Sequence, residues 1–290
     1  MRLLIFGLGY ASEAIARRRL AAGGTVVATV RTAVKAERLS NEGILTRLFS
    51  PEHHDHAIFG DIAGCEAVLV SIPPSETGDE VLRIFGDALA AAPKLRWLGY
   101  LSTVGVYGDR NGDWVDETTP PAPIEPRSKV RWQVEQDWLA FGERDHLPVQ
   151  IFRLAGIYGP GRNALAQLAA GTARRIVRPG QVFNRVHVDD IAQVVCASMA
   201  HPRAGAIYNV SDDEPAPPQD VVTFAAGLCG VPPPLEVAFE DAKLSPMGRS
   251  FYDECKRVKS TLLHSELGVK LEYPTYRHGL RALRAAGEGP

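Results

Sequence analysis

Two glycines near the start of the chain have the spacing of a turn that binds phosphate groups. Residues 7–12, with the sequence GLGYAS, follow a short apolar run and precede a stretch at helical spacing, residues 11–22. In this context Gly7 permits a tight turn. Gly9 lets the backbone approach a pyrophosphate, which the free amides of a helix N-terminus bind. Ser12 replaces the third glycine of the pattern, a position that mainly governs helix–strand packing. The turn predicts a dinucleotide site, and a glycine-rich turn without a ligand is the alternative.

A basic residue stands where the strand after this turn should end. The apolar segment 25–30 is followed by Arg31 and Thr32. NAD-binding proteins place an Asp or Glu here, because a carboxylate accepts a hydrogen bond from the ribose 2′-hydroxyl. No carboxylate is present, whereas a guanidinium can bind a 2′-phosphate through two N–H groups. The sequence therefore favours NADP, with NAD as the alternative. A solvated arginine after a strand is the interpretation without function.

Alternating strand-like and helix-like segments must position this turn. Apolar runs of strand length occur at 3–6, 25–30, 67–70, 95–102 and 149–154. Helical patterns lie at 11–22, 32–40, 76–92 and 127–142, and later at 189–199 and 219–228. Strands separated by helices imply βαβ units, and hence a parallel sheet covered on both faces. We expect an α/β fold, a Rossmann-type doubly wound parallel sheet with a small C-terminal cap on the substrate side.

The domain organisation follows from where this periodicity fades. Beyond residue 155 the chain contains more proline and glycine, as in the run Pro232-Pro233-Pro234. We expect residues 1–160 to form the dinucleotide-binding domain, with 186–211 returning to its sheet. Residues 161–185 and 212–290 should form the cap.

Composition excludes several classes of protein and partner. The chain has 32 Lys and Arg against 34 Asp and Glu, a net charge of -2, so it has no long-range field to attract nucleic acid or anionic lipid. Its four cysteines lie far apart without a C-x-x-C pair, which argues against a zinc site and suits a reducing cytoplasm. No apolar run approaches the roughly 18 residues of a membrane span. We expect a cytoplasmic protein without metal, nucleic-acid or membrane partners.

Several later motifs resemble the extended short-chain dehydrogenase/reductase family, also called the NAD-dependent epimerase/dehydratase family. In the family's order they are LSTVGVYG at 101–108, DETTP at 116–120, FRL and GIYGPGR within 152–162, VHVDDIA at 186–192, YNVS at 208–211, and ELG, YP and GL within 266–280. The resemblance covers nearly the whole chain, and six motifs in the right order imply the family's fold and nucleotide site.

The family's chemistry, as the resemblance implies it, rests on a Ser or Thr and on a Y-x-x-x-K pair. The tyrosine passes a proton to or from the substrate oxygen, and the lysine lowers its pKa and holds the nicotinamide ribose. Thr103 matches the Ser or Thr. The pair should lie eight and four residues before a glutamate, and counting back from Glu135 gives Arg127 and Arg131.

Neither possible register supplies the tyrosine. The alternative count, from the Ser128-Lys129 pair, gives Glu125 and Lys129, and no tyrosine occurs between Tyr107 and Tyr158. Arginine does not deprotonate and cannot replace tyrosine as an acid or base. The chain therefore resembles the atypical members that keep the fold and the nucleotide loop but lose the tyrosine.

The predicted site residues fall into three groups. Catalysis is assigned to Thr103, Arg127 and Arg131. The cofactor should contact Gly7, Gly9, Tyr10, Ala11, Ser12, Arg31, Thr32, Ser71, Ile72, Pro73, Ser102, Arg131, Leu154, Ala155 and Ile157. The substrate should contact Tyr107, Tyr158, Arg162, Arg185 and His187.

Two functions remain open at this point. The first is an atypical NADP-dependent oxidoreductase or epimerase that acts on a small carbonyl or hydroxyl substrate, which the arginines of the cap suggest is anionic. Its proton would come from Tyr107, Tyr158, His187 or water. The second is a dinucleotide-binding sensor or assembly partner without turnover. A homodimer is compatible with either.

Overall fold

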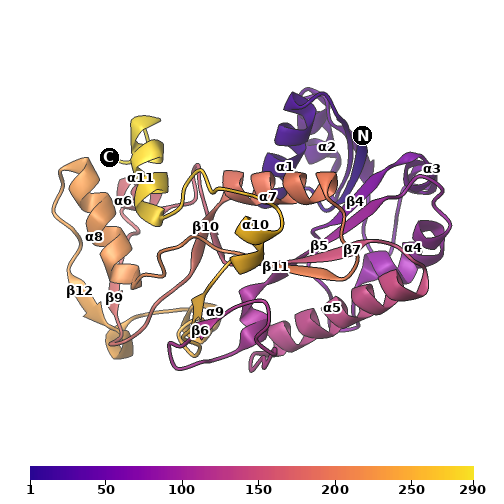
Figure 1. The fold of residues 1–290 in the computed structure, drawn as a ribbon. Coiled ribbons are helices and arrows are strands. Elements are labelled where there is room, and N and C mark those ends of the chain that lie inside the picture. Colours follow the sequence, from indigo (N-terminus) through magenta and orange to yellow (C-terminus); the bar gives the residue numbers. More distant parts are fainter. The chain divides into compact units, whose positions relative to one another are not determined.

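Seven strands form the central sheet of the chain, which the computed structural model describes over all 290 residues (Figure 1). Their order is β11-β7-β5-β4-β1-β2-β3, and neighbours such as β1 and β2 or β4 and β5 run parallel. The strands are β1 (Arg2–Phe6), β2 (Thr25–Val30), β3 (Leu45–Leu48), β4 (Ala67–Val70), β5 (Trp97–Thr103), β7 (Val149–Leu154) and β11 (Ala206–Val210). The strand order reverses between β1 and β4, and ligands of open α/β sheets bind beyond the carboxyl ends of the strands at such a point.

Helices cover both faces of this sheet. They are α1 (Tyr10–Ala21), α2 (Ala33–Ser40), α3 (Ala57–Gly64), α4 (Glu80–Ala90), α5 (Pro126–Arg144) and α7 (Val188–Ala200). Figure 1 shows α1 and α2 on one side of the sheet and α4 and α5 on the other. Every residue of β4 and β7 is buried, as expected for parallel strands covered on both faces. The predicted α/β fold with a doubly wound Rossmann-type sheet is confirmed.

The sequence pattern located most of these elements. The predicted strands are confirmed as β1, β2, β4, β5 and β7, and the late helical patterns as α7 and α8 (Pro218–Cys229). The pattern missed β3 and α3. Strand β3 is a half-exposed edge strand that contains Thr46 and Arg47, so it has no continuous apolar run for a pattern to detect.

The chain forms two compact units. The first consists of Met1–Thr103, Pro126–Arg153 and Ile191–Tyr208, and the second of Val104–Glu125, Leu154–Asp190 and Asn209–Pro290. The second unit contains three two-stranded parallel ribbons: β8 (Gly156–Tyr158) with β10 (Arg185–His187), β9 (Arg175–Val177) with β12 (Glu236–Ala238), and β6 (Trp114–Val115) with β13 (Arg257–Val258). Its helices are α6 (Ala164–Ala169), α8, α9 (Pro246–Ser250), α10 (Thr261–Ser265) and α11 (Tyr276–Ala285), with short 3-10 turns η1 (Val104–Tyr107) and η2 (Phe239–Asp241). The division by function, into a dinucleotide-binding domain at 1–160 with 186–211 and a substrate-side cap at 161–185 and 212–290, stays a prediction.

None of the helices combines the length and the apolar character that a membrane crossing requires.

Candidate functional site

The glycine turn joins β1 to α1, and its first glycine is required by the protein's own packing. Gly7 has a φ of +87°, a conformation that side chains rarely adopt. A Cβ at this position would lie 2.6 Å from Cγ1 of Ile72. The Gly7 N–H donates to Thr29 Oγ1 at 2.9 Å, which ties the turn to β2. The fold therefore explains this glycine without any ligand.

The second glycine has no such internal explanation. Gly9 has a φ of -106°, and a Cβ here would meet no atom closer than Ser12 Oγ, at 3.9 Å. The Ser12 hydroxyl accepts the Gly9 N–H at 2.7 Å and donates to the Gly7 carbonyl at 2.8 Å, so it braces the turn from within. Open space beside Gly9, at the start of α1, fits the close approach of a pyrophosphate.

The end of β2 presents an arginine without a counter-ion. Arg31 is exposed and makes no ion pair. The neighbouring Thr32 caps α2, because its Oγ1 accepts the backbone N–H of Lys35 at 3.3 Å. The guanidinium of Arg31 is thus available for an anionic group, whereas the hydroxyl of Thr32 already has a structural partner.

A second cation beside the glycine turn was missed by the sequence analysis. The ammonium of Lys35 donates to the Leu8 carbonyl inside the turn and pairs with Glu13 at 2.9 Å. Glu13 also pairs with Arg38 at 2.9 Å and with Arg17 at 3.2 Å. Burial of Glu13 acts to raise its pKa, but its hydrogen bond with Lys35 and these charges together lower it. Spacing alone does not reveal this network, because it joins α1 to α2 through side chains.

The carboxyl end of β4 lies next to the turn. The Ser71 N–H donates to the Phe6 carbonyl at 2.9 Å, which extends the pairing of β4 with β1. Ile72 is the residue that packs on Gly7, and Pro73 is exposed. The structure therefore brings these three predicted cofactor residues to the end of the sheet that carries the glycine turn.

A buried charged network lies behind the end of β5. Ser102 donates to Glu135 Oε1 at 2.5 Å, and Glu135 Oε2 pairs with Arg153 at 2.7 Å. The side chains of Glu135 and Arg153 are 0% and 2% exposed. The network joins β5, α5 and β7, so the hydroxyl of Ser102, a predicted cofactor residue, already serves this internal contact.

The predicted catalytic residues lie at the end of β5 and in the first two turns of α5. Arg131 donates through Nη1 to the Leu101 carbonyl at 2.9 Å and to the Tyr100 hydroxyl at 3.3 Å. Burial raises the pKa of Tyr100, so this phenol stays protonated. Thr103 ends β5 and is partly buried, and Arg127 is exposed in the first turn of α5. Arg131 is therefore a cation held on β5 at Leu101, two residues before Thr103.

Tyr107 lies in a small buried core of the second unit. Its side chain is fully buried, and its hydroxyl donates to Asn209 Oδ1 at 2.8 Å. It packs with Val106, Val115 and Val258. Its ring therefore has core neighbours and its hydroxyl has a buried partner, and the contact of Tyr107 with a substrate stays a prediction.

Tyr158 and His187 are register partners on β8 and β10, with ring centres 5.1 Å apart. Burial is the main cause that raises the pKa of Tyr158, and burial also lowers the pKa of His187 against the opposing charge of Asp189. His187 Nδ1 accepts the Asp189 N–H at 3.3 Å, which assigns the ring proton to Nε2. Both groups are therefore neutral near pH 7.

The remaining predicted contacts also lie in the second unit. Leu154 and Ala155 are buried, and Ile157 is half-buried on β8. Arg162 is exposed in the turn that begins at Gly159. Arg185 is partly buried and opens β10.

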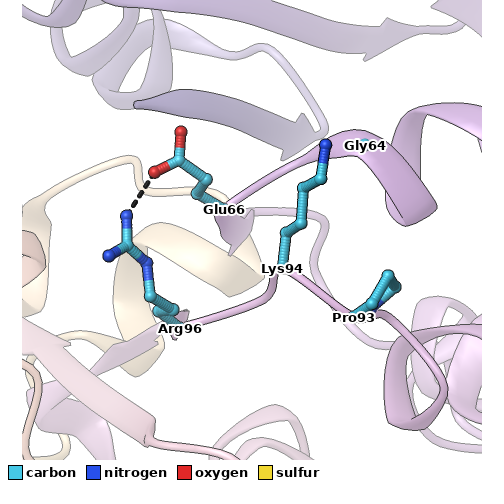
Figure 2. A pocket seen from close by; sticks show the side chains of 5 residues that line it. All are labelled: Gly64, Glu66, Pro93, Lys94 and Arg96. Atoms are coloured by element: carbon cyan, nitrogen blue, oxygen red, sulfur yellow. Dashed lines mark hydrogen bonds and ion pairs between the residues drawn. The ribbon is translucent and has the colours of Figure 1, made fainter.

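A shallow hollow of about 330 Å³ lies elsewhere on the first unit (Figure 2). Gly64, Glu66, Pro93, Lys94 and Arg96 line it, and Glu66 pairs with Arg96. Glu66 and Arg96 each directly precede a strand, so the hollow lies at the amino ends of β4 and β5. Ligands of such sheets bind at the carboxyl ends, so this hollow is not part of the candidate site.

Known proteins resemble this chain along most of its length. The sequence model described as the NAD dependent epimerase/dehydratase family matches residues 3–211. Protein YeeZ of Escherichia coli strain K12 is 30% identical over 288 residues, which cover 94% of this chain and 96% of that protein. A solved structure, of a functionally unknown conserved protein from Silicibacter pomeroyi DSS, has a TM-score of 0.89 and 48% identity over 99% of both chains.

A more distant solved structure shows likeness of fold alone. The dTDP-glucose 4,6-dehydratase DesIV from Streptomyces venezuelae, with NAD and TYD bound, has a TM-score of 0.77 and 18% identity. The alignment covers 98% of this chain and 97% of that one.

Proposed function

Because this chain belongs to the NAD-dependent epimerase/dehydratase family, we propose that it binds NADP and acts as an atypical oxidoreductase or epimerase on a small carbonyl or hydroxyl compound. The observation that carries the proposal is the pair formed by Gly9 and Arg31. Gly9 leaves open space at a helix N-terminus, and Arg31 offers an unpaired cation one strand away. A dinucleotide with a 2′-phosphate satisfies both features.

The residues of the first unit fit this cofactor. The amides of the first turn of α1 lack intrahelical acceptors and carry the positive end of the helix dipole, so they would hold the pyrophosphate. Arg31 would bind the 2′-phosphate, with Lys35 as a second cation beside it. When bound, the nicotinamide donates or accepts a hydride. NAD remains the alternative, since Lys35 and Arg31 do not prevent its binding.

The chain's own catalytic contribution would be electrostatic. Thr103 would donate a hydrogen bond to the reacting substrate oxygen, and Arg131 would stabilise negative charge that develops there. Arg131 is suited to this role because its guanidinium is fixed on the Leu101 carbonyl. Arg127, on the same helix start, would hold an anionic group of substrate or cofactor. The proton would come from water, since α5 contains no tyrosine and Tyr107 is buried and bonded.

The same observations favour a second candidate function. A chain whose α5 has no tyrosine, and whose Tyr158 and His187 are buried, could bind the dinucleotide without turnover and act as a sensor or assembly partner. This candidate keeps the roles of Gly9 and Arg31 and drops those of Thr103 and Arg131.

One experiment separates the two functions. Purified protein is titrated with NADPH, followed by nucleotide fluorescence, and then incubated with NADPH and a panel of aldehydes, ketones and oxo acids. Oxidation of NADPH that is lost in Thr103→Val would support the enzyme. Tight binding without turnover on any carbonyl would favour the binding protein over the oxidoreductase. Absence of binding to NADPH and NADH alike would overturn both.

A further inference from the structure

The β8–β10 ribbon collects polar side chains on one face. Arg185 is the register partner of Gly156, and His187 is the partner of Tyr158. Alternate residues of a strand point to the same face, and register partners share it. Arg185, His187 and Tyr158 therefore project from one face, and Gly156 adds no side chain beside Arg185.

The guanidinium of Arg185 has only neutral partners. Its Nη1 donates to the carbonyls of Phe183 at 2.9 Å and Ala216 at 3.1 Å. Its Cζ lies 6.0 Å from the centre of the Tyr276 ring, and no carboxylate lies within ion-pair distance. A partly buried cation normally has a counter-ion, because removing charge from water is costly. The N–H groups on Nε and Nη2 of Arg185 make none of these contacts. They lie on one edge of the planar guanidinium, where two parallel N–H groups match the two oxygens of a carboxylate.

Four buried polar atoms in this cluster lack a hydrogen-bond partner. They are the hydroxyls of Tyr158 and Tyr276, Nε2 of His187 and Oδ2 of Asp212. These side chains are 8%, 1%, 2% and 2% exposed. Tyr158, Tyr276 and Asp212 all act electrostatically on Arg185. Native proteins rarely leave such atoms unsatisfied, so their concentration around one cation points to a ligand.

The charge of the cluster selects the kind of ligand. Burial raises the pKa of the Asp212 carboxyl well above its usual range, and the charge of Arg185 opposes this shift. Arg185 supplies one positive charge, Tyr158 and Tyr276 supply neutral hydroxyl donors, and the Asp190 carboxyl acts on Tyr158 from nearby. This balance matches a monoanion better than a phosphate dianion. Arg185 is partly buried, whereas Tyr158, Tyr276, His187 and Asp212 are buried.

We propose that Arg185, Tyr158 and Tyr276 form a binding site for a carboxylate, and that the substrate is therefore a small hydroxy or oxo acid. The identification of this acid as the substrate rests on the proposed function, whereas the site itself requires no cofactor. Arg185 supplies a bidentate contact, and the two hydroxyls supply the neutral donors.

The test measures binding to the nucleotide-free full-length protein by titration calorimetry. The probes are lactate and 3-hydroxybutyrate, with lactamide as the neutral analogue and inorganic phosphate as the dianion. We expect the two acids to bind and lactamide not to bind. Arg185→Gln should weaken binding of the acids by about ten-fold or more. Arg178→Gln is the matched control, because Arg178 is a partly buried arginine of the same unit that lies over Phe239, outside the cluster.

Two conservative variants separate a ligand role from a structural one. Tyr158→Phe and Tyr276→Phe remove hydroxyls that have no internal partner and keep the rings. Each should weaken binding of the acids several-fold and leave the melting temperature unchanged or higher. A lower melting temperature in both would mean that the hydroxyls serve the fold, and it would overturn the proposal.

Other outcomes are equally decisive. The carboxylate site would be overturned if lactamide bound as tightly as lactate, or if phosphate bound more tightly than the acids. It would also be overturned if Arg185→Gln and Arg178→Gln weakened acid binding equally, or if no acid bound at concentrations up to about 10 mM. Acid binding in a protein that fails to bind NADPH would leave the site standing and overturn the proposed function. Oxidation of NADPH with neutral ketones but no acid binding would do the reverse.

Discussion

Gly7 and Gly9 share one turn but meet different requirements. Gly7 combines a positive φ with the close contact of Ile72, so its lack of a side chain serves the fold. Gly9 has ordinary backbone angles and open space beside it, so its lack of a side chain serves only an approaching ligand. This difference between two residues of one motif can be measured.

We expect Gly9→Ala to lower NADPH affinity strongly while it changes the free energy of unfolding by less than about 0.5 kcal/mol. Gly7→Ala should instead destabilise the protein by about 1–3 kcal/mol, because it forces a strained φ. Urea denaturation gives the stabilities, and fluorescence titration gives the affinities. Retained NADPH affinity in Gly9→Ala would mean that the turn is not the nucleotide site.

Arg31 is the residue on which the preference for NADP depends. A charge-assisted contact with a phosphate contributes about 1.5–3 kcal/mol, so Arg31→Ala should weaken NADPH by about ten-fold or more. NADH lacks the 2′-phosphate, and its affinity should stay the same. The matched control is Arg38→Ala, since Arg38 already pairs with Glu13 and Glu42. An equal loss of both nucleotides in Arg31→Ala would contradict its role as a phosphate ligand.

At the scale of elements, one buried network sets the relation of β5, α5 and β7. The contacts of Ser102, Glu135 and Arg153 bring these three elements together beneath the strand end that carries Thr103. A buried ion pair is costly to break, because the remaining partner keeps its charge without compensation. The network therefore couples the stability of the sheet to the position of the candidate catalytic residues.

Glu135→Gln should lower the free energy of unfolding by about 3–5 kcal/mol, because it removes the carboxylate that pairs with the buried Arg153. Glu42→Gln is the control, since Glu42 pairs with Arg17 and Arg38 at the surface and such pairs contribute about 0–1 kcal/mol. Both values come from urea denaturation followed by circular dichroism. Similar effects of the two substitutions would mean that the buried network is not a principal support of the sheet.

At the scale of the whole molecule, buried carboxyl groups make stability depend on pH. Asp190 is fully buried at the start of α7, and its oxygens accept the N–H groups of Glu272 at 2.7 Å and Tyr273 at 3.1 Å. Burial is the main cause that raises the pKa of Asp190 to about 6. Because this pKa is higher in the folded state than in the unfolded state, the folded protein binds more protons between about pH 4 and 6.

Stability contributed by Asp190 should therefore be present at low pH and fall as the pH rises through about 6. The loss should amount to about 2–3 kcal/mol, since one pKa unit corresponds to about 1.4 kcal/mol. The measurement compares the wild type with Asp190→Asn at pH 4.5 and pH 7 by urea denaturation. A pH dependence that is the same in both proteins would rule out Asp190 as its source.

Features that are local along the chain could be predicted from the amino-acid sequence. The alternation of strands and helices, the turn at Gly7 and Gly9, and the basic residue at the end of β2 each depend on neighbours within about one βαβ unit. Hydrophobic periodicity and backbone freedom act over these short distances, so the printed sequence is sufficient to predict them. An exposed edge strand such as β3 lacks this periodicity and was missed for that reason.

Which polar side chains meet depends on the packing of distant segments in the folded chain. Tyr107 and Asn209 are 102 residues apart in sequence, and their hydrogen bond gives the Tyr107 hydroxyl a buried partner. Lys35 gained a place beside the glycine turn, and Arg185 gained Tyr276 as a neighbour, through the packing of separate elements. Spacing cannot reveal such contacts, because burial and the choice of a hydrogen-bond partner depend on segments that only the folded chain brings together.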